Sequence, residues 1–288
     1  MNPQVSDGYC SVRRRPVSPV AAAGPSLLGW NGGDREECSP ETGEIEALLM
    51  ALAEAVEQRD PHIARHCERL AFTSVALGMA LHLDRPSLVA LYRGGFLHDI
   101  GKVGIPDDIL FQPTRLTPEQ WVIMQSHTIR GERICRPVKA FAPVLPIIRH
   151  HHEKWDGSGY PDGLRGTDIP LLARVLQVAD IYDALTSPRP YKPAYSIKEA
   201  LRILETETEL GYRDPDIVSR FFQLHGTVIA RIEQLSLSED TRFEAALGSL
   251  DEAVNQRRMV DRRPNGRNSS PPPQSAPEAG FPWAAGGT

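Results

Sequence analysis

Three consecutive histidines, His150, His151 and His152, are the part of the sequence best suited to chemistry. They end an apolar stretch and run directly into a loop rich in glycine and proline, Glu153 to Pro161. A rigid scaffold commonly presents functional residues from such a loop. Adjacent imidazoles at the end of a helix are either solvated or metal ligands, and the run alone does not distinguish the two.

Further histidines and carboxylates stand where helical patterns would present them inward. They are His66, His98, Asp99, His127 and Asp180. His98 and Asp99 end an apolar helix, and a buried imidazole and carboxylate need a polar partner, which a metal ion supplies. Asp180 lies in an equally apolar helix and needs a partner for the same reason. His127 follows Met124 at i+3, so a histidine satisfied within the core is the alternative there.

Two long blocks around these residues resemble the HD-GYP branch of the HD-domain metal-dependent phosphohydrolases. One is His98-Asp99-Ile100-Gly101-Lys102 followed by Gly104-Ile105-Pro106-Asp107, and the other runs from His151-His152-Glu153 to Gly159-Tyr160-Pro161. Together with His66, His127 and Asp180, the resemblance covers about residues 44–225. A His-Asp pair alone carries little information, whereas these blocks in this order are specific. The resemblance implies an all-α fold, an HD-domain helical bundle with extra C-terminal helices.

The resemblance also implies a binuclear metal site. Its ligands would be His66, His98, Asp99, His127, His151, His152 and Asp180. Imidazoles and carboxylates without a thiolate favour iron or manganese, with zinc, magnesium, nickel and cobalt as alternatives. Seven ligands exceed the need of one ion, so two divalent ions about 3.5–4 Å apart are expected, and by resemblance Asp99 bridges them. Members with a third ion carry a glutamate where this chain has His62, so we predict two ions and keep His62 as a candidate extra ligand.

The activity implied by the resemblance is hydrolysis of cyclic di-GMP to linear pGpG, with further cleavage to GMP. Two cations that share a water lower its pKa toward neutrality, which provides a hydroxide to attack phosphorus. The expected catalytic residues are Asp99 and Lys102. The expected substrate-binding residues are Lys102, Arg189, Lys192, Gly159, Tyr160 and Pro161. The Gly-Tyr-Pro loop is also expected to offer a surface to a diguanylate cyclase or another signalling protein.

Two other functions remain open from the sequence. The chain could be a cyclic di-GMP sensor or protein-interaction module with little turnover, or an HD-domain phosphohydrolase of another nucleotide. The complete ligand set and Lys102 favour an enzyme. The segment from Trp155 to Pro161, together with Arg189 to Lys192, favours the cyclic dinucleotide as substrate.

Helical periodicity and capping signals predict the elements that position these residues. An apolar stripe from Ile45 to Val56 predicts a first helix, and Asp60-Pro61 predicts the start of a second that places His62 and His66 on one face. Further starts are predicted at Pro86, Thr117-Pro118-Glu119-Gln120, Pro143, Pro170, Ser196 and Asp214-Pro215. The helix from Thr117 is expected to carry His127, and the helix from Pro143 to reach His152 with His150 facing away.

The overall organisation predicted is one folded domain at residues 44–256. A disordered arm is expected at 1–40 and a disordered basic, proline-rich tail at 257–288. Hydrophobic residues make up 41% of the chain, enough for a substantial core, and a formal charge of −5 gives no reason to expect a nucleic-acid polymer as partner. The cysteines form no C-x-x-C pair and no apolar run approaches the ~18 residues of a membrane span, so we expect a cytoplasmic protein. A homodimer is compatible with all of this.

Overall fold

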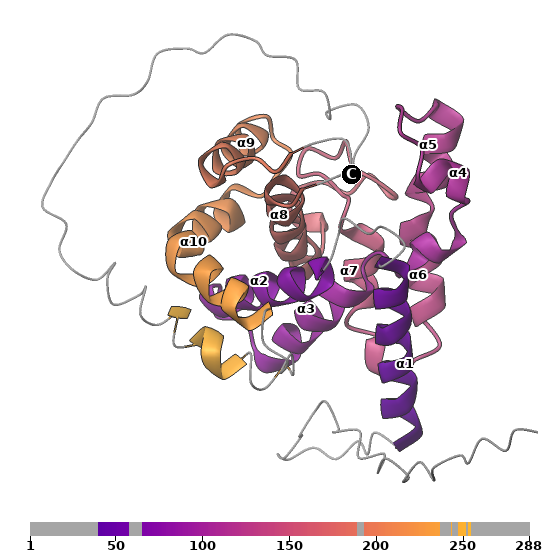
Figure 1. Cartoon of the computed structure of the whole chain (residues 1–288), viewed down its shortest axis with the longest axis horizontal. Coiled ribbons are helices and arrows are strands. Elements are labelled where there is room, and N and C mark those ends of the chain that lie inside the picture. The colour runs from indigo at the N-terminus through magenta and orange to yellow at the C-terminus, as the bar shows by residue number, and fades with distance from the viewer. Residues whose placement is uncertain are drawn as a thin grey trace, which may run out of the picture.

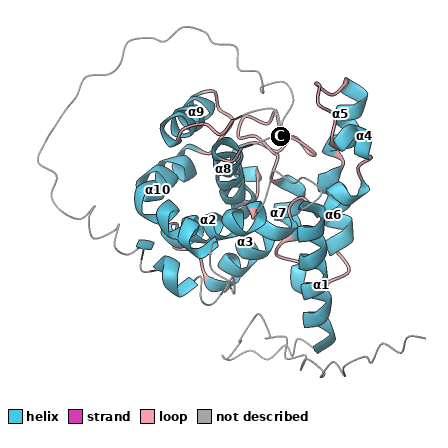
Figure 2. Ribbon diagram, in the orientation of Figure 1, coloured by secondary structure: helices cyan, strands magenta, loops and turns pink. Residues whose placement is uncertain are grey.

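The computed structural model describes residues 40–57, 65–188, 193–236, 243, 247–251 and 253–254. Within these ranges the regular elements are all helices (Figures 1 and 2). This confirms the all-α prediction. Residues 1–39 and 255–288 lie outside the described part, and with them almost all of the two expected arms. None of the described helices is both long and apolar enough to cross a lipid bilayer.

Four helices form the centre of the molecule: α2 (His66–Ala80), α3 (Arg85–Leu97), α8 (Leu171–Thr186) and α10 (Pro215–Ser236). Nearly every side chain of α2 is buried, because the helix packs against all three of the others. α2 and α3 approach so closely that a Cβ atom at Gly95 would lie 2.5 Å from the Cα of Ala71. Only glycine permits this distance, and the contact fixes α2 relative to the end of α3 from which His98 emerges.

The remaining helices are shorter or more peripheral. Their bounds are α1 (Pro40–Glu57), η1 (Ile100–Gly104), α4 (Asp107–Leu110), α5 (Pro118–Gln125), α6 (His127–Cys135), η2 (Lys139–Phe141), α7 (Leu145–His150), η3 (Gly166–Asp168) and α9 (Ile197–Glu209). Only the C-terminal half of the apolar stripe predicted for α1 is buried. Ala53 and Val56 are buried, whereas Ile45 and Leu48 are 47% and 69% exposed.

Side-chain caps begin several helices where the sequence predicts them. Thr117 and Gln120 form a reciprocal capping box, and Ser196 accepts a hydrogen bond from the N–H of Glu199. Asp214 accepts from the N–H groups of Asp216 and Ile217 at the start of α10. These predictions succeed because a cap depends only on neighbouring residues.

The predicted start of the second helix differs from the structure. α2 begins at His66, and Arg65 before it has a left-handed backbone with φ of 61°. A helix that starts at Pro61 therefore cannot run unbroken into His66. Asp60, Pro61 and His62 lie outside the described residues, so the structure does not place His62 beside His66.

Two predicted helices are also shorter than expected. The helix from Thr117 is interrupted at Ser126, where the hydroxyl donates to the carbonyl of Ile123 at 2.6 Å and the backbone turns as a 3₁₀ step. His127 is thus the first residue of a new helix, α6. α7 ends at His150, and His151 and His152 lie in the turn that follows it.

A second, smaller core lies apart from the main one. It consists of Ile105, Ile109 and Met124, with Leu110, Leu116 and Trp121 packed around them. These residues belong to α4, α5 and their connections, which stand off the side of the helical body (Figure 1). Trp121 and Met124 connect this small core to the site described next.

Candidate metal centre

The structure brings together all seven predicted metal-ligand residues. They form two groups in which the potential ligand atoms lie within 4.8 Å of one another. The core group is His66, His98 and Asp180, and the loop group is Asp99, His127, His151 and His152. The core group comes from α2, the end of α3 and α8, whereas the loop group comes from the start of α6 and the turns after α3 and α7.

Asp99 lies between the two groups. Its Oδ2 atom is 3.2 Å from Nε2 of His98, and its Oδ1 atom is 3.3 Å from Nε2 of His127. One oxygen therefore faces each group, which is the arrangement that a bridging carboxylate requires. Oδ1 is also 3.9 Å from Nε2 of His151.

The backbone orients three of the imidazole rings. Nδ1 of each ring lies within hydrogen-bond distance of the carbonyl oxygen three residues earlier. The pairs are His98 with Gly95 at 3.1 Å, His127 with Met124 at 2.7 Å and His151 with Ile148 at 2.8 Å. A carbonyl only accepts, so Nδ1 carries the proton and Nε2 keeps its lone pair for a metal ion.

The fourth ring, His66, is oriented by a carboxylate that the sequence analysis missed. Nδ1 of His66 donates to Oδ2 of Asp183 at 2.7 Å, and Arg69 Nε donates to the other oxygen at 2.6 Å. Burial alone would raise the pKa of Asp183, but His66 and Arg69 outweigh it and hold the pKa well below its ordinary value. The available signal was a second aspartate three residues after Asp180 in an apolar helix, where an unpartnered carboxylate would be costly.

The protonation states suit divalent cations. Burial lowers the pKa of His127 to about 4 and the pKa values of His151 and His152 well below their ordinary value. These imidazoles are therefore neutral at pH 7. Burial alone would raise the pKa of Asp99, but Lys102 and His98 outweigh it, so this carboxylate is ionised.

Two buried polar atoms at the junction lack a hydrogen-bond partner among the described residues. They are Nε2 of His98 and Oδ1 of Asp99. An unsatisfied buried polar atom costs roughly 1–3 kcal/mol, and a cation between the groups would satisfy both. The donor types, the protonation states and these two atoms all fit a pair of divalent ions.

The Gly-Tyr-Pro loop packs against the loop group. The ring of Tyr160 lies 4.8 Å from the ring of His152 and 5.9 Å from the ring of Trp121. The buried carboxylate of Glu153 accepts hydrogen bonds from the N–H groups of Asp162 at 2.8 Å and Leu164 at 3.1 Å. Glu153 thus fixes the backbone of the loop, and Tyr160 of the loop lines the candidate site beside His152.

Gly159 has a packing role in this loop. A Cβ atom at this position would lie 2.2 Å from the backbone nitrogen of Lys154 and 2.5 Å from the Cα of Glu153. A larger residue would therefore push the loop away from the His-His-Glu segment. His150 lies outside both ligand groups, as expected, and bonds Asp162 at 2.9 Å instead.

The predicted cationic residues are only partly described. Nζ of Lys102 lies 2.6 Å from Oδ2 of Asp99, so the amine is at the junction of the two groups. Arg189 and Lys192 lie outside the described residues, as does His62. Their predicted roles remain predictions.

The chain belongs to the HD domain family, whose model matches residues 50–217. This agrees with the resemblance inferred from the motifs. The chain is 38% identical over 206 residues to a cyclic di-GMP phosphodiesterase from Thermotoga maritima, which covers 69% of this chain and 55% of that protein. It is 36% identical over 161 residues to a 3'3'-cGAMP-specific phosphodiesterase from Vibrio cholerae, with 56% of this chain and 35% of that protein covered.

A solved structure agrees with the fold. The crystal structure of a cyclic GMP-AMP-specific phosphodiesterase from V. cholerae superposes with a TM-score of 0.53 at 20% identity, covering 75% of this chain and 59% of that one. At this identity the comparison supports the helical architecture alone. The chain spans about half of the length of the first curated relatives, 55% and 48%.

Proposed function

We propose that the chain is a metal-dependent phosphodiesterase that opens a cyclic dinucleotide, with cyclic di-GMP as the first candidate and pGpG and then GMP as products. The observation that carries this proposal is the meeting of the two ligand groups at Asp99, with the amine of Lys102 at the same carboxylate. The relatives support the reaction class, because those reported above are phosphodiesterases of cyclic dinucleotides.

Different residues of the chain would bind the cations and stabilise the charge that develops in such a reaction. His66, His98 and Asp180 would hold one cation, His127, His151 and His152 the other, and Asp99 would join them. When bound, a pair of divalent cations supplies Lewis acidity, which lowers the pKa of a water toward neutrality and screens the phosphodiester charge. Lys102 adds a fixed positive charge where the non-bridging phosphate oxygens gain negative charge. Tyr160, whose ring lies 4.8 Å from the ring of His152, would shield this side of the site from bulk water.

The metal proposed is iron or manganese. The neutral imidazoles of His127, His151 and His152 and the ionised carboxylate of Asp99 join the other three ligand residues in a mixed nitrogen and oxygen donor set, and no cysteine lies in either group. We propose two ions, since the described residues provide two groups. The compartment proposed is the cytoplasm; within the described part Cys67 and Cys135 are buried and form no disulfide.

The test compares candidate substrates under identical conditions. The 288-residue chain, loaded with manganese or with iron under anaerobic conditions, is incubated with cyclic di-GMP and with 3'3'-cyclic GMP-AMP, and the products are separated by chromatography. We expect a linear dinucleotide from cyclic di-GMP. Asp99→Ala should abolish turnover, whereas His150→Ala serves as the matched control because His150 lies outside both groups.

The alternatives give different results. Tight binding of cyclic di-GMP without products would identify a sensor. Hydrolysis of cyclic GMP-AMP alone would keep the reaction and change the substrate. Neither binding nor turnover of either compound, with metal present, would contradict the proposal and favour an HD-domain phosphohydrolase of another nucleotide.

A further inference from the structure

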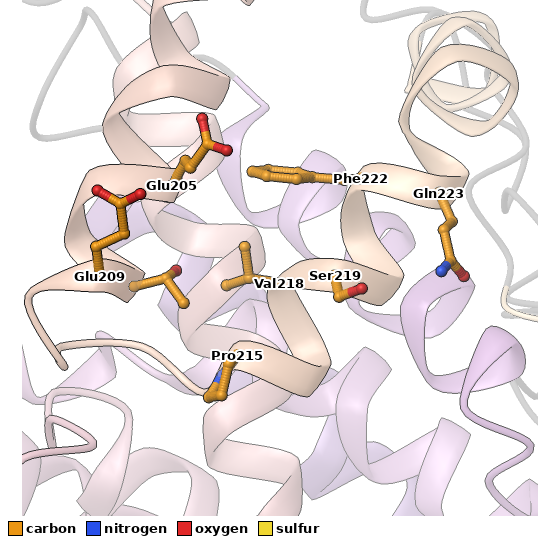
Figure 3. Close-up of a pocket in the computed structure, with 8 residues that line it drawn as sticks. Glu205, Glu209, Pro215, Val218, Ser219, Phe222 and Gln223 are labelled. Atoms are coloured by element: carbon orange, nitrogen blue, oxygen red, sulfur yellow. The ribbon is translucent and has the colours of Figure 1, made fainter. Parts of the chain in front are cut away.

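A groove between α9 and α10 lies away from the candidate metal centre. It has a volume of about 630 Å³, and none of the seven ligand residues lines it. Pro215, Val218 and Phe222 provide apolar surface from α10, while Glu205 and Glu209 stand on the α9 side. Figure 3 shows the ring of Phe222 extending from α10 toward Glu205. The groove therefore combines an apolar floor with an acidic wall.

The two glutamates of this wall are uncompensated. Both are exposed, and among the described residues neither carboxylate forms an ion pair or a hydrogen bond. They are four residues apart on α9, so they face the same side and repel each other slightly. A positively charged occupant would remove this repulsion.

The sequence contains a segment with the matching pattern. Residues 257–263 read Arg-Arg-Met-Val-Asp-Arg-Arg, in which an apolar pair, Met259 and Val260, lies between two pairs of arginines. The apolar pair matches the floor of the groove and the arginines match its wall. Arginine suits such a contact, because its guanidinium group can bond a carboxylate through two N–H groups and its stem covers apolar surface.

The segment starts close to the described part of the chain. The last described residue, Val254, is buried in the same core as Val218, which lines the groove. An extended chain covers about 3.3–3.6 Å per residue, so Arg257 and Arg258 stay within about 10–14 Å of Val254, whereas Arg262 and Arg263 extend to about 26–32 Å. α10 has 22 residues, which corresponds to about 33 Å along its axis. The second arginine pair therefore has a reach close to the length of α10 and is the pair that suits the acidic wall.

We propose that the segment 257–263 docks in the groove between α9 and α10 of its own chain. This surface is separate from the candidate metal centre, and the proposal does not depend on which reaction that centre catalyses. It predicts an intramolecular contact that salt weakens, since the pairing is electrostatic and at the surface.

Disulfide trapping in the 288-residue chain tests the contact. Ser219→Cys places a thiol in the groove and Val260→Cys places one in the segment, in a background where Cys10 and Cys38 are serine. At low protein concentration we expect an intrachain disulfide to form about tenfold or more faster than in a matched control, Val122→Cys with Val260→Cys. Val122 is 66% exposed on α5, so access to its thiol is not limiting.

Charge exchange separates docking from damage to the fold. Replacing Glu205 and Glu209 with lysine should slow the trapping several-fold, and adding Arg262→Glu and Arg263→Glu to the same chain should restore it. A misfolded groove would not be rescued by changes in the segment. Equal trapping at Ser219 and Val122, disulfides between chains instead of within one, or trapping that is indifferent to charge exchange would each overturn the proposal.

Discussion

The core group and the loop group of the candidate metal centre are held by different kinds of interaction. His66 and Asp180 belong to the long helices α2 and α8, and His98 directly follows α3; all three helices are largely buried in the main core. The loop group lies at the ends of short helices and in turns, and polar braces hold it. Glu153 bonds the backbone of the Gly-Tyr-Pro loop, and Gln177 donates to the carbonyl oxygens of His151 and Glu153.

This difference has a consequence for robustness. In apolar packing, the stability lost on a substitution is distributed over many contacts. Where a few buried hydrogen bonds hold a loop, losing one of them removes much of its stabilisation. We therefore expect loss of a polar partner near the loop group to weaken that cation site selectively, and we expect the core group to respond in the same way where it has such a partner, at Asp183. The following predictions are ordered from the largest effect to the smallest.

The largest effect should follow from Asp99→Asn, which removes the charge that the two groups share. Both cations should bind more weakly, and turnover should fall about a thousandfold or more, because the bridging oxygen and its charge act on both ions. Elemental analysis of the reconstituted protein measures the stoichiometry. Loss of one ion only, with the other bound normally, would contradict the bridging assignment.

Glu153→Gln should weaken metal binding by the loop group and leave the core group unchanged. The buried carboxylate accepts two backbone N–H groups, and a neutral amide would lose the charge and one acceptor, at a cost of about 2–3 kcal/mol in the free energy of unfolding. Metal titration should show weakened binding of one ion and normal binding of the other. Glu132→Gln is the matched control, because its partners are an exposed arginine, Arg136, and a half-buried one, Arg149, and it should cost about 1 kcal/mol.

Asp183→Asn should act on the core group alone. The amide keeps one acceptor but no longer fixes both His66 and Arg69, and loss of such an orienting partner typically weakens metal binding about 10- to 100-fold. The Mn²⁺ dissociation constants, followed by electron paramagnetic resonance, would show a change in one site. Ser187→Ala removes a hydroxyl that accepts from Arg69 at 2.9 Å and donates to Asp183 at 3.3 Å. Because the shorter bonds of Asp183 to His66 and Arg69 remain, it should leave both constants nearly unchanged.

The smallest effect concerns pH. Hydrogen bonds from Arg149 lower the pKa of Asp162 to about 2, so its ionised form stabilises the fold above the unfolded-state pKa near 4. That contribution disappears as the pH falls toward 2. About one-third of this side chain is exposed, so we expect about 1 kcal/mol.

Asp162→Asn tests this contribution. The difference in free energy of unfolding between the unchanged chain and the variant should be present at pH 7 and narrow between pH 4 and pH 2. Urea titrations at several pH values measure it. A difference that grows on acidification would show that the sign is wrong.

The sequence predicted those features that depend on neighbouring residues or on a motif. The caps at Thr117, Ser196 and Asp214 are set within three residues, and the seven ligand candidates stand in recognisable blocks. The start of α2 depends on Arg65 adopting a left-handed backbone, which no local signal indicated. The break at Ser126 depends on one hydroxyl bonding the preceding turn.

Asp183 and Glu153 show a different limit of sequence reasoning. Each is a buried carboxylate whose partners are not its helical neighbours. His66 is 117 positions from Asp183, and the N–H groups that Glu153 accepts lie nine and eleven positions away, across the Gly-Tyr-Pro loop. Periodicity places such a residue on the inner face of a helix or in a motif but does not identify what it meets there. The tertiary fold supplies the partner, and with it the role.

The carbonyl contacts of the three backbone-oriented imidazoles limit how this centre can be retuned. His98, His127 and His151 are held by peptide oxygens, and a point mutation replaces side chains while leaving those oxygens in place. His66 differs, because its orienting acceptor is the side chain of Asp183. Directed evolution of metal preference should therefore act most easily at position 183. A substitution there changes the basicity of His66 and leaves the orientation of His98, His127 and His151 unchanged.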